Sequence, residues 1–272
     1  MSGSTSALAG IDIGASGTRV GIDADGAVVR RERKVAMPLL GGRIDETRLS
    51  LIIGEILREA AAERAVTRFD RIALGIAGLP GRMDDPSELA RLIGRIVPVE
   101  TVIVAADAVT THMGALDGHE GAVVAAGTGV VALGTDFHSV WNRADAWGFL
   151  LGDEGGGAWI GMAGLKAALR AYDGRSDGSS TLLEHMRAAF GDPLALVEQV
   201  YRSETPASTM AAFAPAVADA ARAGDRLAAA IWREAATRLA DAVSAAAAEV
   251  EPLISWGGRL FDAGEIVLEP FR

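Results

Sequence analysis

The first part of the chain alternates short apolar runs with turn residues, a pattern typical of strands joined by tight turns. The spacing of the apolar positions predicts three strands, then a helix, a strand, a second helix and a final strand. In chain order, we expect these elements at Leu8–Ile13, Thr18–Ile22, Val28–Val35, Thr47–Arg64, Arg71–Ala77, Pro86–Ile96 (with Ser87 as a cap) and Thr101–Ala106. A three-stranded meander followed by helix–strand–helix–strand predicts a mixed α/β sheet with covering helices.

The strand–glycine turn–strand pattern starts again in the middle of the chain. Gly121–Ala126 and Val130–Gly134 are strand candidates joined by Gly127-Thr128-Gly129. The stretch GAVVAAGTGVVALGTD looks like the earlier AGIDIGASGTRVGID. The likeness is too degenerate to establish a duplication, but a two-lobed protein with one glycine hairpin in each lobe would show it. We place the boundary between the lobes near Ala108–Gly118.

The region from Gly161 to about Glu249 is Ala-rich and almost entirely helical in its pattern. Its last helix has one clear apolar face, formed by Trp232, Ala236, Leu239, Val243, Ala246 and Val250. Pro252 is expected to stop this helix. A short strand candidate, Leu253–Trp256, then leads into Gly257-Gly258.

The length of the chain allows two lobes of ordinary size. It has 272 residues, of which 50% are hydrophobic, so there is ample material for buried cores. We predict an N-terminal lobe over residues 1–112 and a C-terminal lobe over residues 113–272. A helical insertion at about 161–250 enlarges the second lobe.

The composition excludes several classes of protein. There is no cysteine, so disulfides, thiolate zinc sites, cysteine nucleophiles and cysteine-held iron–sulfur clusters are excluded. No stretch approaches the roughly 18 uninterrupted apolar residues of a membrane span. The N-terminus lacks a basic region, and Asp12 interrupts its first apolar run, so we expect no signal peptide. These features predict a cytoplasmic protein with no membrane partner.

The charge of the chain argues against nucleic-acid binding. The formal net charge is −10, and the only lysines are Lys34 and Lys166. A duplex-binding surface needs clustered cations to neutralise phosphates. The single basic cluster, Arg30–Lys34, is interpreted as a solvated strand end.

Asp12 stands on a strand candidate beside a turn rich in Gly, Ser and Thr. The turn residues are Gly14, Ser16, Gly17 and Thr18. Phosphate oxygens need backbone N–H donors at close range, and residues with small side chains permit that approach. A carboxylate there would repel phosphate unless a cation intervened, so Asp12 implies Mg²⁺, held through water. An ordinary tight hairpin is the alternative.

Gly127-Thr128-Gly129 is a second candidate phosphate turn, and the hydroxyl of Thr128 adds a donor. Glycine hairpins are common, so this turn alone is a weak signal. Paired with the first turn, it could hold the β- and γ-phosphates of a nucleotide from the opposite side.

Asp107 directly follows an apolar strand candidate. It could be the N-cap of a helix over Ala108–Ala115. It could also be a carboxylate at the mouth of a cleft, where ligands of open α/β sheets bind. An alcohol that attacks phosphorus needs a base mainly to orient its hydroxyl and to accept its proton late, which an aspartate can do.

The segment WGFLLGDEGGG, from Trp147 to Gly157, places an acidic pair, Asp153 and Glu154, among glycines. Carboxylates accept hydrogen bonds from sugar hydroxyls, and a Trp face can pack on a sugar ring. A helix start with favourable acidic residues would explain the acids, but not the glycines and the Trp.

Other motifs carry weaker signals. Ser255–Gly258 would let a flat ligand approach the backbone closely, or it is only a strand-to-helix turn. The sequence contains no P-loop and no Ser/His/Asp elbow. We assign no role to the histidines, which lack metal-ligand spacing: His112, His119, His138 and His185.

Taken in order, GIDIGASGTR, VIVAADA, AGTG, WGFLLGDEGGGAWIG and SWGG resemble the motifs of the N-acetylglucosamine kinase family. That family lies in the BadF/BadG-type branch of the sugar kinase–Hsp70–actin superfamily. The resemblance covers essentially the whole chain. It implies two ribonuclease-H-like lobes of the actin-like ATPase type, with ATP and a sugar in the cleft between them.

The resemblance also implies roles for residues. Asp107 matches the catalytic base, and Asp12 lies in the first phosphate motif. The positions matching nucleotide contacts are Gly14, Ser16, Gly17, Thr18, Gly127, Thr128 and Gly129 for phosphate, and Gly257 and Gly258 for adenosine. The positions expected to contact sugar are Gly78, Asp107, Trp147, Gly148 and Asp153.

The implied reaction is transfer of the γ-phosphoryl group of ATP to the 6-hydroxyl of an amino sugar, N-acetylglucosamine or glucosamine. ATP and Mg²⁺ are the expected cofactors, ATP and the sugar are the expected partners, and homodimer formation is left open. The related ATPase activators of radical dehydratases need cysteines for an iron–sulfur cluster, so that activity is excluded.

The sequence departs from the family pattern at several points. Val130 and Gly156 stand where the family usually has Ser, and the loop Met37–Gly42 lacks the Asn common in N-acetylglucosamine-specific members. Family members also continue further after the adenosine motif, so we expect a truncated chain or a C-terminal lobe finished differently. The alternative function is therefore a sensor of sugar or nucleotide with weak or no catalysis, against which Asp12 and Asp107 argue.

Overall fold

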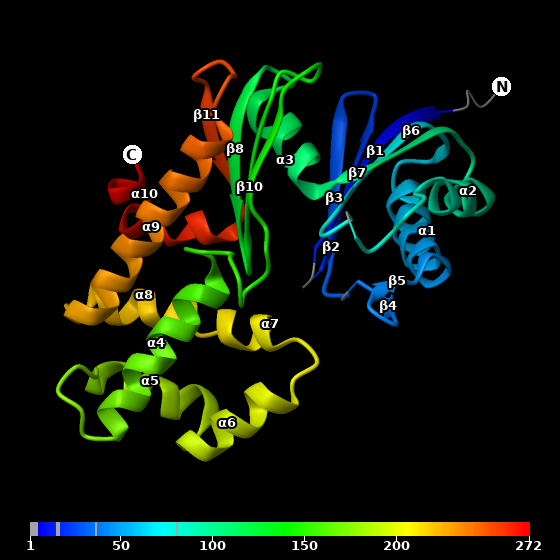
Figure 1. Cartoon of the computed structure of the whole chain (residues 1–272). Coiled ribbons are helices and arrows are strands. Elements are labelled where there is room, and N and C mark those ends of the chain that lie inside the picture. The colour runs from blue at the N-terminus through cyan, green and yellow to red at the C-terminus, as the bar shows by residue number, and fades with distance from the viewer. Residues whose placement is uncertain (1–4, 15–16, 36, 80) are drawn as a thin grey trace. The chain divides into compact units, whose positions relative to one another are not determined.

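The computed structural model describes residues 5–14, 17–35, 37–79 and 81–272. The chain divides into two compact units, Met1–Thr111 and His112–Arg272. Each unit has a sheet of its own (Figure 1). Each also has its own hydrophobic core. The architecture is mixed α/β, as the apolar pattern predicts.

The first unit contains a five-stranded sheet with the order β3-β2-β1-β6-β7. Strands β1, β2 and β3 form an antiparallel meander, and β6 and β7 run parallel to β1. Their bounds are Thr5–Ile13, Thr18–Ala24, Ala27–Arg33, Val66–Ile76 and Val99–Ala106, respectively. The loop after β3 contains a separate small hairpin, β4 (Leu39–Leu40) and β5 (Arg43–Ile44).

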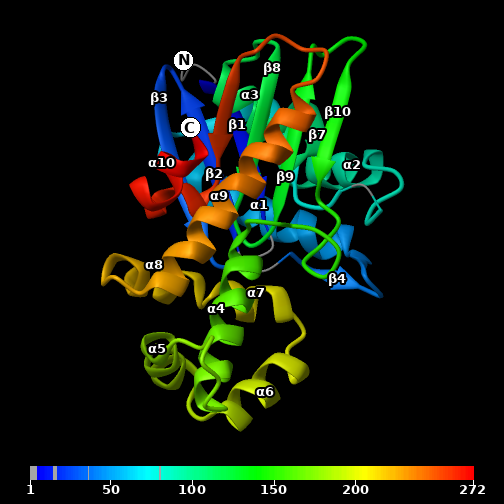
Figure 2. The same ribbon diagram turned by 60° about the vertical axis from the view of Figure 1, so that its left-hand side comes forward.

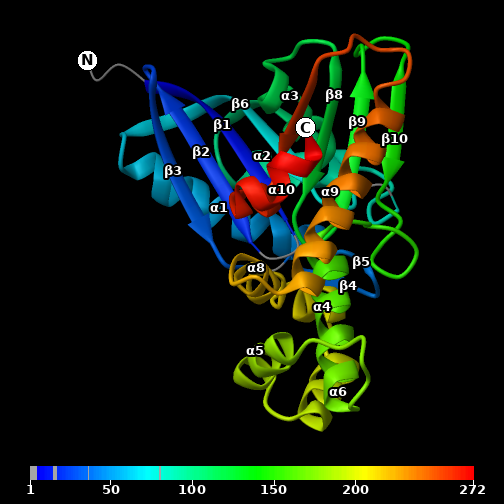
Figure 3. The ribbon, with the colours of Figure 1, turned by 90° about the vertical axis from the view of Figure 1, so that its left-hand side faces the viewer.

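Two helices, α1 (Glu46–Ala62) and α2 (Ser87–Ile96), cover one face of this sheet (Figure 3). Alternate residues of β1 are buried in the core with the apolar faces of these helices. A third helix, α3 (Asp107–Leu116), begins directly after β7. Period-two alternation therefore decides which β1 side chains face the core and which face away from it.

The predicted element order of this unit is confirmed, with two local corrections. Strand β6 begins at Val66, five residues before the predicted start at Arg71. Ser87 does not cap α2, because Pro86 is at the N-cap and the N–H of Ser87 donates to the Asp85 carboxylate, 2.8 Å away.

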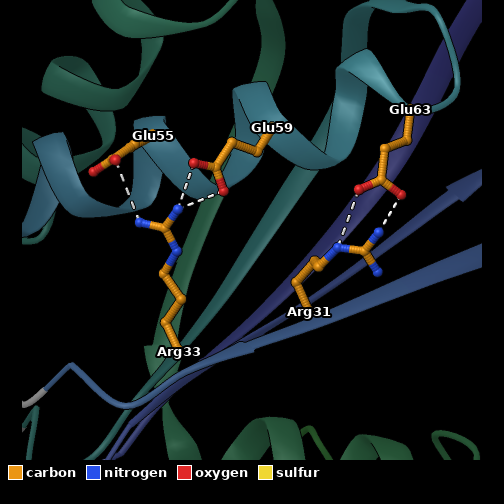
Figure 4. A network of polar contacts seen from close by, with 5 residues as sticks. All are labelled: Arg31, Arg33, Glu55, Glu59 and Glu63. Atoms are coloured by element: carbon orange, nitrogen blue, oxygen red, sulfur yellow. Dashed lines mark hydrogen bonds and ion pairs between the residues drawn. The ribbon is translucent and has the colours of Figure 1, made fainter.

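The basic cluster at the end of β3 is paired rather than simply solvated. Arg33 binds Glu55 and Glu59 on α1, and Arg31 binds Glu63 at the C-cap of that helix (Figure 4). The Arg31 Nε atom lies 3.1 Å from a Glu63 oxygen. Two of the basic side chains in this cluster are therefore neutralised by glutamates from α1 and its C-cap.

The second unit contains a four-stranded sheet with the order β10-β9-β8-β11. Its strands are β8 (Gly121–Ala126), β9 (Val130–Thr135), β10 (Trp141–Asp145) and β11 (Ile254–Gly257). The first three are antiparallel neighbours, and β11 runs parallel to β8. Strand β10 is absent from the prediction, because this edge strand is mostly polar and carries no apolar alternation.

The long helix α9 (Arg226–Ala246) packs across β8, β9 and β10 (Figure 2). The predicted face of α9 is buried, although Val250 lies beyond the helix end. The other helical elements are α4 (Gly157–Tyr172), α5 (Ser180–Phe190), α6 (Pro193–Arg202), α7 (Pro206–Ala211), α8 (Ala214–Arg222), the 3-10 helix η1 (Arg259–Ala263) and α10 (Glu265–Phe271). No helix within the described ranges is long and apolar enough to cross a membrane.

Candidate functional site

Two aspartates of the first unit lie at the same end of its sheet. Asp12 on β1 is paired with Gly75 on β6, which is paired with Ala105 on β7, and Asp107 follows two residues later. The carboxyl ends of parallel strands meet at one edge, which is where ligands of open α/β sheets bind. The neighbours of Asp12 on β1, Ile11 and Ile13, are buried in the core. The Asp12 side chain therefore leaves the opposite face of the sheet.

The Asp107 carboxyl group has an environment that disfavours its charge. Burial is the main cause and raises the pKa of Asp107, and the negative charge of Asp12 raises it further. The N–H of Ala108, 2.9 Å from the carboxylate, acts in the opposite direction. An N-cap side chain accepts the N–H of the residue two or three positions further along the helix. Asp107 instead accepts the N–H of the residue that directly follows it. A buried carboxylate with a raised pKa at a strand end is typical of a proton acceptor.

Asp12 forms an ion pair with Arg19 on the neighbouring strand β2. The Arg19 Nη1 atom lies 2.8 Å from the Asp12 carboxylate, and its Nε atom lies 3.4 Å from Glu32. The Asp12 side chain is 46% exposed. This arrangement was not predicted from the sequence, although strand register would bring Arg19 opposite Asp12.

The donor set around Asp12 fits a magnesium ion held mostly by water and phosphate. In the part of the chain that the structure describes, no group of three or more His, Asp or Glu side chains could hold a metal. Mg²⁺ keeps several waters and is usually bound through one or two carboxylates and the phosphates of a substrate. The half-exposed Asp12 carboxylate meets that requirement. A bound Mg²⁺ would share this carboxylate with Arg19.

The first glycine turn is held by a bond from the N–H of Gly14 to the carbonyl oxygen of Gly17, 2.9 Å long. A Cβ atom on Gly17 would lie 3.0 Å from the carbonyl oxygen of Arg33, so β3 also demands a small residue there. Thr18 is only 2% exposed. Ser16 lies outside the described residues.

The second glycine turn, Gly127–Gly129, is attached to the start of α4. The N–H of Gly157 donates to the carbonyl of Gly127 (2.8 Å), and the N–H of Ala158 donates to the carbonyl of Thr128 (2.9 Å). The first N–H groups of a helix have no partner within the helix. Here they bind the turn, which fixes the turn and the helix relative to each other.

Asp153 packs directly against this turn. A Cβ atom on Gly129 would lie 2.4 Å from the Asp153 Oδ2 atom. Burial raises the pKa of Asp153, the N–H of Val130 lowers it, and the charge of Asp145 raises it again. The proximity of Asp153 to the turn explains why position 129 has no room for a side chain.

Gly258 lies against the end of β8, immediately before the same turn. Its φ is +97°, and a Cβ atom there would lie 2.2 Å from the carbonyl oxygen of Ala126. The structure therefore brings together three predicted features within the second unit: the phosphate turn, the Asp153 segment and the Gly257-Gly258 pair.

Trp147 is 65% exposed, and the Arg143 guanidinium lies 4.5 Å from its ring centre. Gly148 follows with a φ of +82°. A pocket of about 310 Å³ opens on the α9 side of this segment. It is lined by Ala144, Asp145, Trp147, Leu151, Gly152, Glu154, Arg238, Asp241 and Ala242.

Gly78 lies after β6, next to the strand that leads to Asp107. It is exposed, its φ is +65°, and a Cβ atom there would lie 3.4 Å from the Arg82 side chain. The predicted residues thus form one group in each unit. The first unit holds Asp12, Gly14, Gly17, Thr18, Gly78 and Asp107; the second holds Gly127, Thr128, Gly129, Trp147, Gly148, Asp153, Gly257 and Gly258.

Asp145 is a residue of this site that was not predicted from the sequence. Its carboxylate accepts hydrogen bonds from the N–H groups of Asp153 (2.6 Å) and Glu154 (3.0 Å). Nothing in the apolar pattern indicates this contact, because Asp145 ends an unpredicted strand. By contrast, His112 agrees with the absence of an assigned role: it is buried, and its Nε2 atom lies 2.9 Å from the Gly121 carbonyl oxygen.

Comparisons with known proteins identify relatives along most of the chain. Residues 9–261 match the BadF/BadG/BcrA/BcrD ATPase family. An N-acetylmuramic acid/N-acetylglucosamine kinase of Clostridium acetobutylicum is 29% identical over 196 residues. That alignment covers 69% of this chain and 58% of the relative, so the chain matches less than two thirds of the relative's length.

Solved structures with the same fold are also found. A proposed N-acetylglucosamine kinase from Chromobacterium violaceum is 27% identical, with a TM-score of 0.76 over 96% of this chain and 90% of that chain. A second protein of that description, from Porphyromonas gingivalis, is 18% identical, with a TM-score of 0.75 over 97% of this chain and 90% of that chain.

Proposed function

The chain belongs to the BadF/BadG/BcrA/BcrD ATPase family, and on that premise we propose that it is an ATP-dependent kinase of amino sugars. The acceptor atom would be the 6-hydroxyl of N-acetylglucosamine or glucosamine. The names of the Clostridium and Chromobacterium relatives support the substrate class. The observation that carries the proposal is the partly buried Asp107 carboxyl group near Asp12, at the carboxyl ends of β7 and β1.

Asp107 would act as the base. Phosphoryl transfer has a loose transition state, so the base mainly orients the attacking hydroxyl and accepts its proton late. The raised pKa makes Asp107 a better proton acceptor than an aspartate in water. The Ala108 N–H fixes one carboxylate oxygen and leaves the other for the sugar hydroxyl.

Each unit would supply one glycine turn to the same ATP molecule. We assign phosphate contacts to Gly14, Ser16, Gly17 and Thr18 of the first unit, and to Gly127, Thr128 and Gly129 of the second. Gly257 and Gly258 would contact the adenosine. The packing of Gly258 on the end of β8 supports a continuous surface for the nucleotide in the second unit.

Asp12 would hold magnesium through water. When bound, this ion neutralises negative charge on the phosphates of ATP. The partial exposure of Asp12 supports indirect binding. Arg19 would keep the Asp12 carboxylate in place when the nucleotide is absent.

The sugar would be bound by Gly78 and Asp107 in the first unit, and by Trp147, Gly148 and Asp153 in the second. Asp153 is half-buried, and its oxygens can accept hydrogen bonds from sugar hydroxyls. The exposed face of Trp147 can pack on a sugar ring.

A coupled ADP-release assay tests this function. The purified protein is screened with ATP and Mg²⁺ against glucosamine, N-acetylglucosamine, glucose, mannose and N-acetylmuramic acid. We expect turnover with an amino sugar, and mass spectrometry with NMR of the product should place the phosphate on the 6-oxygen. Turnover with glucose or mannose alone would refute the amino-sugar assignment.

A sensor is the second candidate function, and Val130 favours it. This residue is 3% exposed and puts an apolar side chain where the family usually has a Ser hydroxyl beside the phosphate turn. Measurable nucleotide binding without turnover on any of the five sugars would select the sensor over the kinase.

A further inference from the structure

Two consecutive residues before the Trp147 segment have a backbone conformation that favours glycine. Asp145 has a φ of +62° and Ala146 a φ of +63°. Side chains other than Gly, Asn and Asp rarely adopt this region, and strained backbone persists only where its surroundings hold it. The chain therefore has Asp145 and Ala146 at two positions where glycine would be less strained, although glycines are frequent in the residues that follow.

The strained turn directs the Asp145 carboxylate at the backbone of the next segment. One of its oxygens accepts the N–H of Asp153 at 2.6 Å, and the other accepts the N–H of Glu154 at 3.0 Å. Hydrogen bonds to an ionised acceptor are roughly twice as strong as neutral ones. Asp145 thus fixes two consecutive amides eight and nine residues further along the chain.

Gly152 makes this approach sterically possible. A Cβ atom on Gly152 would lie 2.4 Å from the Asp145 Oδ1 atom and 2.9 Å from the Trp147 Cβ atom. Gly152 has no positive φ, so its backbone conformation alone does not require glycine. The close contact with the Asp145 carboxylate explains why position 152 is occupied by glycine.

One of the two amides that Asp145 holds belongs to Asp153, the residue whose side chain meets the phosphate turn. Asp153 has a φ of +55°, and its carboxylate lies against Gly129. On its other side, the carbonyl of Asp153 accepts the N–H of Gly156 at 3.0 Å. The Asp153 backbone is therefore fixed by Asp145 before it and by the start of α4 after it.

We propose that Asp145 is a positioning residue for the amino-sugar site: its carboxylate fixes the backbone of Asp153 and Glu154 and so sets where the Asp153 carboxylate stands beside the turn. The inference rests on the proposed function, in which Asp153 binds the sugar. The phosphate turn also has its own attachment to Gly157 and Ala158, so part of its support is separate from the contacts of Asp145. Loss of the Asp145 contact should therefore affect the sugar far more than ATP.

The test variant is Asp145→Asn. Asn tolerates a positive φ about as well as Asp, so the backbone strain is unchanged. Its amide offers one acceptor oxygen and turns an NH₂ donor toward the other N–H. Gly152→Ala is the second variant, because its new methyl group overlaps the carboxylate without altering Asp145 itself. The methyl group also overlaps the Trp147 Cβ atom, so the exchange of the two amides is the decisive readout for this variant.

Asp136→Asn is the matched control. Asp136 also accepts backbone N–H groups, from His138, Ser139 and Val140, in the turn between β9 and β10 of the same unit. Its hydrogen bonds go to residues of that same turn, and the change in chemistry is the same.

Hydrogen exchange, followed by mass spectrometry or NMR, measures the exchange rates of the Asp153 and Glu154 amides in the free protein. We expect exchange at these amides to become about tenfold faster or more in Asp145→Asn and Gly152→Ala, and unchanged in Asp136→Asn. Steady-state kinetics should show kcat/KM for the sugar falling by about 10- to 100-fold, the cost of a small misplacement of a binding group. KM for ATP should change by less than about threefold, because the phosphate turn keeps its hydrogen bonds to Gly157 and Ala158.

Two results would overturn the positioning role. Exchange at the two amides that does not change in either variant would mean that Asp145 does not hold them. Faster exchange with unchanged sugar kinetics would mean that the contact serves stability alone.

Failure of the proposed function is distinguishable from both results. If the parent protein turns over no sugar, calorimetric sugar binding replaces kinetics in the same comparison. Weakened binding in the two test variants alone would then support the positioning role, and binding that is equal in all variants or absent in the parent would overturn it.

Discussion

Asp107 combines burial with a neighbouring negative charge, and both act on its acidity in the same direction. Its pKa in the folded protein lies above the ordinary value, so ionisation costs more in the folded state than in the unfolded chain. Stability is therefore lost as pH rises from the ordinary pKa of an aspartate through the raised one. At neutral pH the whole of this cost is present.

Asp107→Asn should abolish most activity and stabilise the protein at neutral pH. The loss of the base should reduce kcat by about 10²- to 10⁴-fold, with ATP affinity within a few-fold of the parent. The variant removes the ionisation cost, and its amide oxygen can still accept the Ala108 N–H. Its gain in Tm over the parent should therefore be larger at pH 7 than at pH 4. Near-parental turnover would remove Asp107 from the role of base.

Asp12→Asn should raise the Mg²⁺ concentration needed for half-maximal activity. It should also move the acidic limb of the pH–rate profile to lower pH, because the charge of Asp12 helps to raise the pKa of Asp107. A magnesium titration and a pH profile of kcat measure the two effects. Unchanged dependence on both would show that Asp12 lies outside the site.

At the scale of elements, the loop after β11 is fixed to the end of β8 by a glycine. Gly258 has φ and ψ of +97° and 158°, and any side chain there would overlap the Ala126 carbonyl. Gly264 also has a positive φ (φ and ψ of +73° and −142°), but a Cβ atom there would have no described residue within 4 Å. Comparing substitutions at the two glycines therefore separates the effect of backbone strain from the effect of contact with the end of β8, where we propose that the nucleotide binds.

Gly258→Ala should lower stability and raise KM for ATP, whereas Gly264→Ala should lower stability only. Each change forces a side chain into a region that is almost exclusive to glycine, at a cost of about 1–3 kcal/mol. Gly258→Ala also displaces the end of β8 that precedes Gly127. Denaturant unfolding and ATP kinetics measure both properties. An unchanged KM for ATP in Gly258→Ala would remove this loop from the adenosine contact.

At the scale of the whole molecule, nucleotide binding should protect both units. If each unit supplies one turn to one ATP, a non-hydrolysable analogue with Mg²⁺ should slow hydrogen exchange around Gly14–Thr18 and around Gly127–Gly129. At 100 times the dissociation constant, the ligand should stabilise the fold by about 2.7 kcal/mol. Protection confined to one unit would contradict a shared nucleotide.

Much of this molecule follows from the apolar pattern. The strands of both sheets that are buried on at least one face were predictable, because alternation along β2 and the apolar run of β8 fix which side chains enter the core. Strand β10 was not, because a polar edge strand carries no such signal. Helix α9 was predictable from the spacing of residues such as Trp232 and Leu239.

The candidate site was predictable only where the residue type itself implies chemistry. Asp107 and the two glycine turns could be proposed from their place after or between strand candidates. The Asp145 contact and the bonds from α4 to the Gly127 turn could not, because they depend on a positive φ at a non-glycine residue and on partners far apart in the chain. The periodicity of apolar residues predicts neither a positive φ nor a contact between residues of different elements.

The hydrogen bonds from Gly157 and Ala158 to the Gly127–Gly129 turn attach the first residues of helix α4 to that turn. The helix has 16 residues, so it extends about 24 Å from the turn at 1.5 Å per residue. It carries α5, α7 and α8 along its length. If ligand binding tilted α4 at the turn, the helices packed along it would be displaced with it, and a spectroscopic label on α5 would report the change.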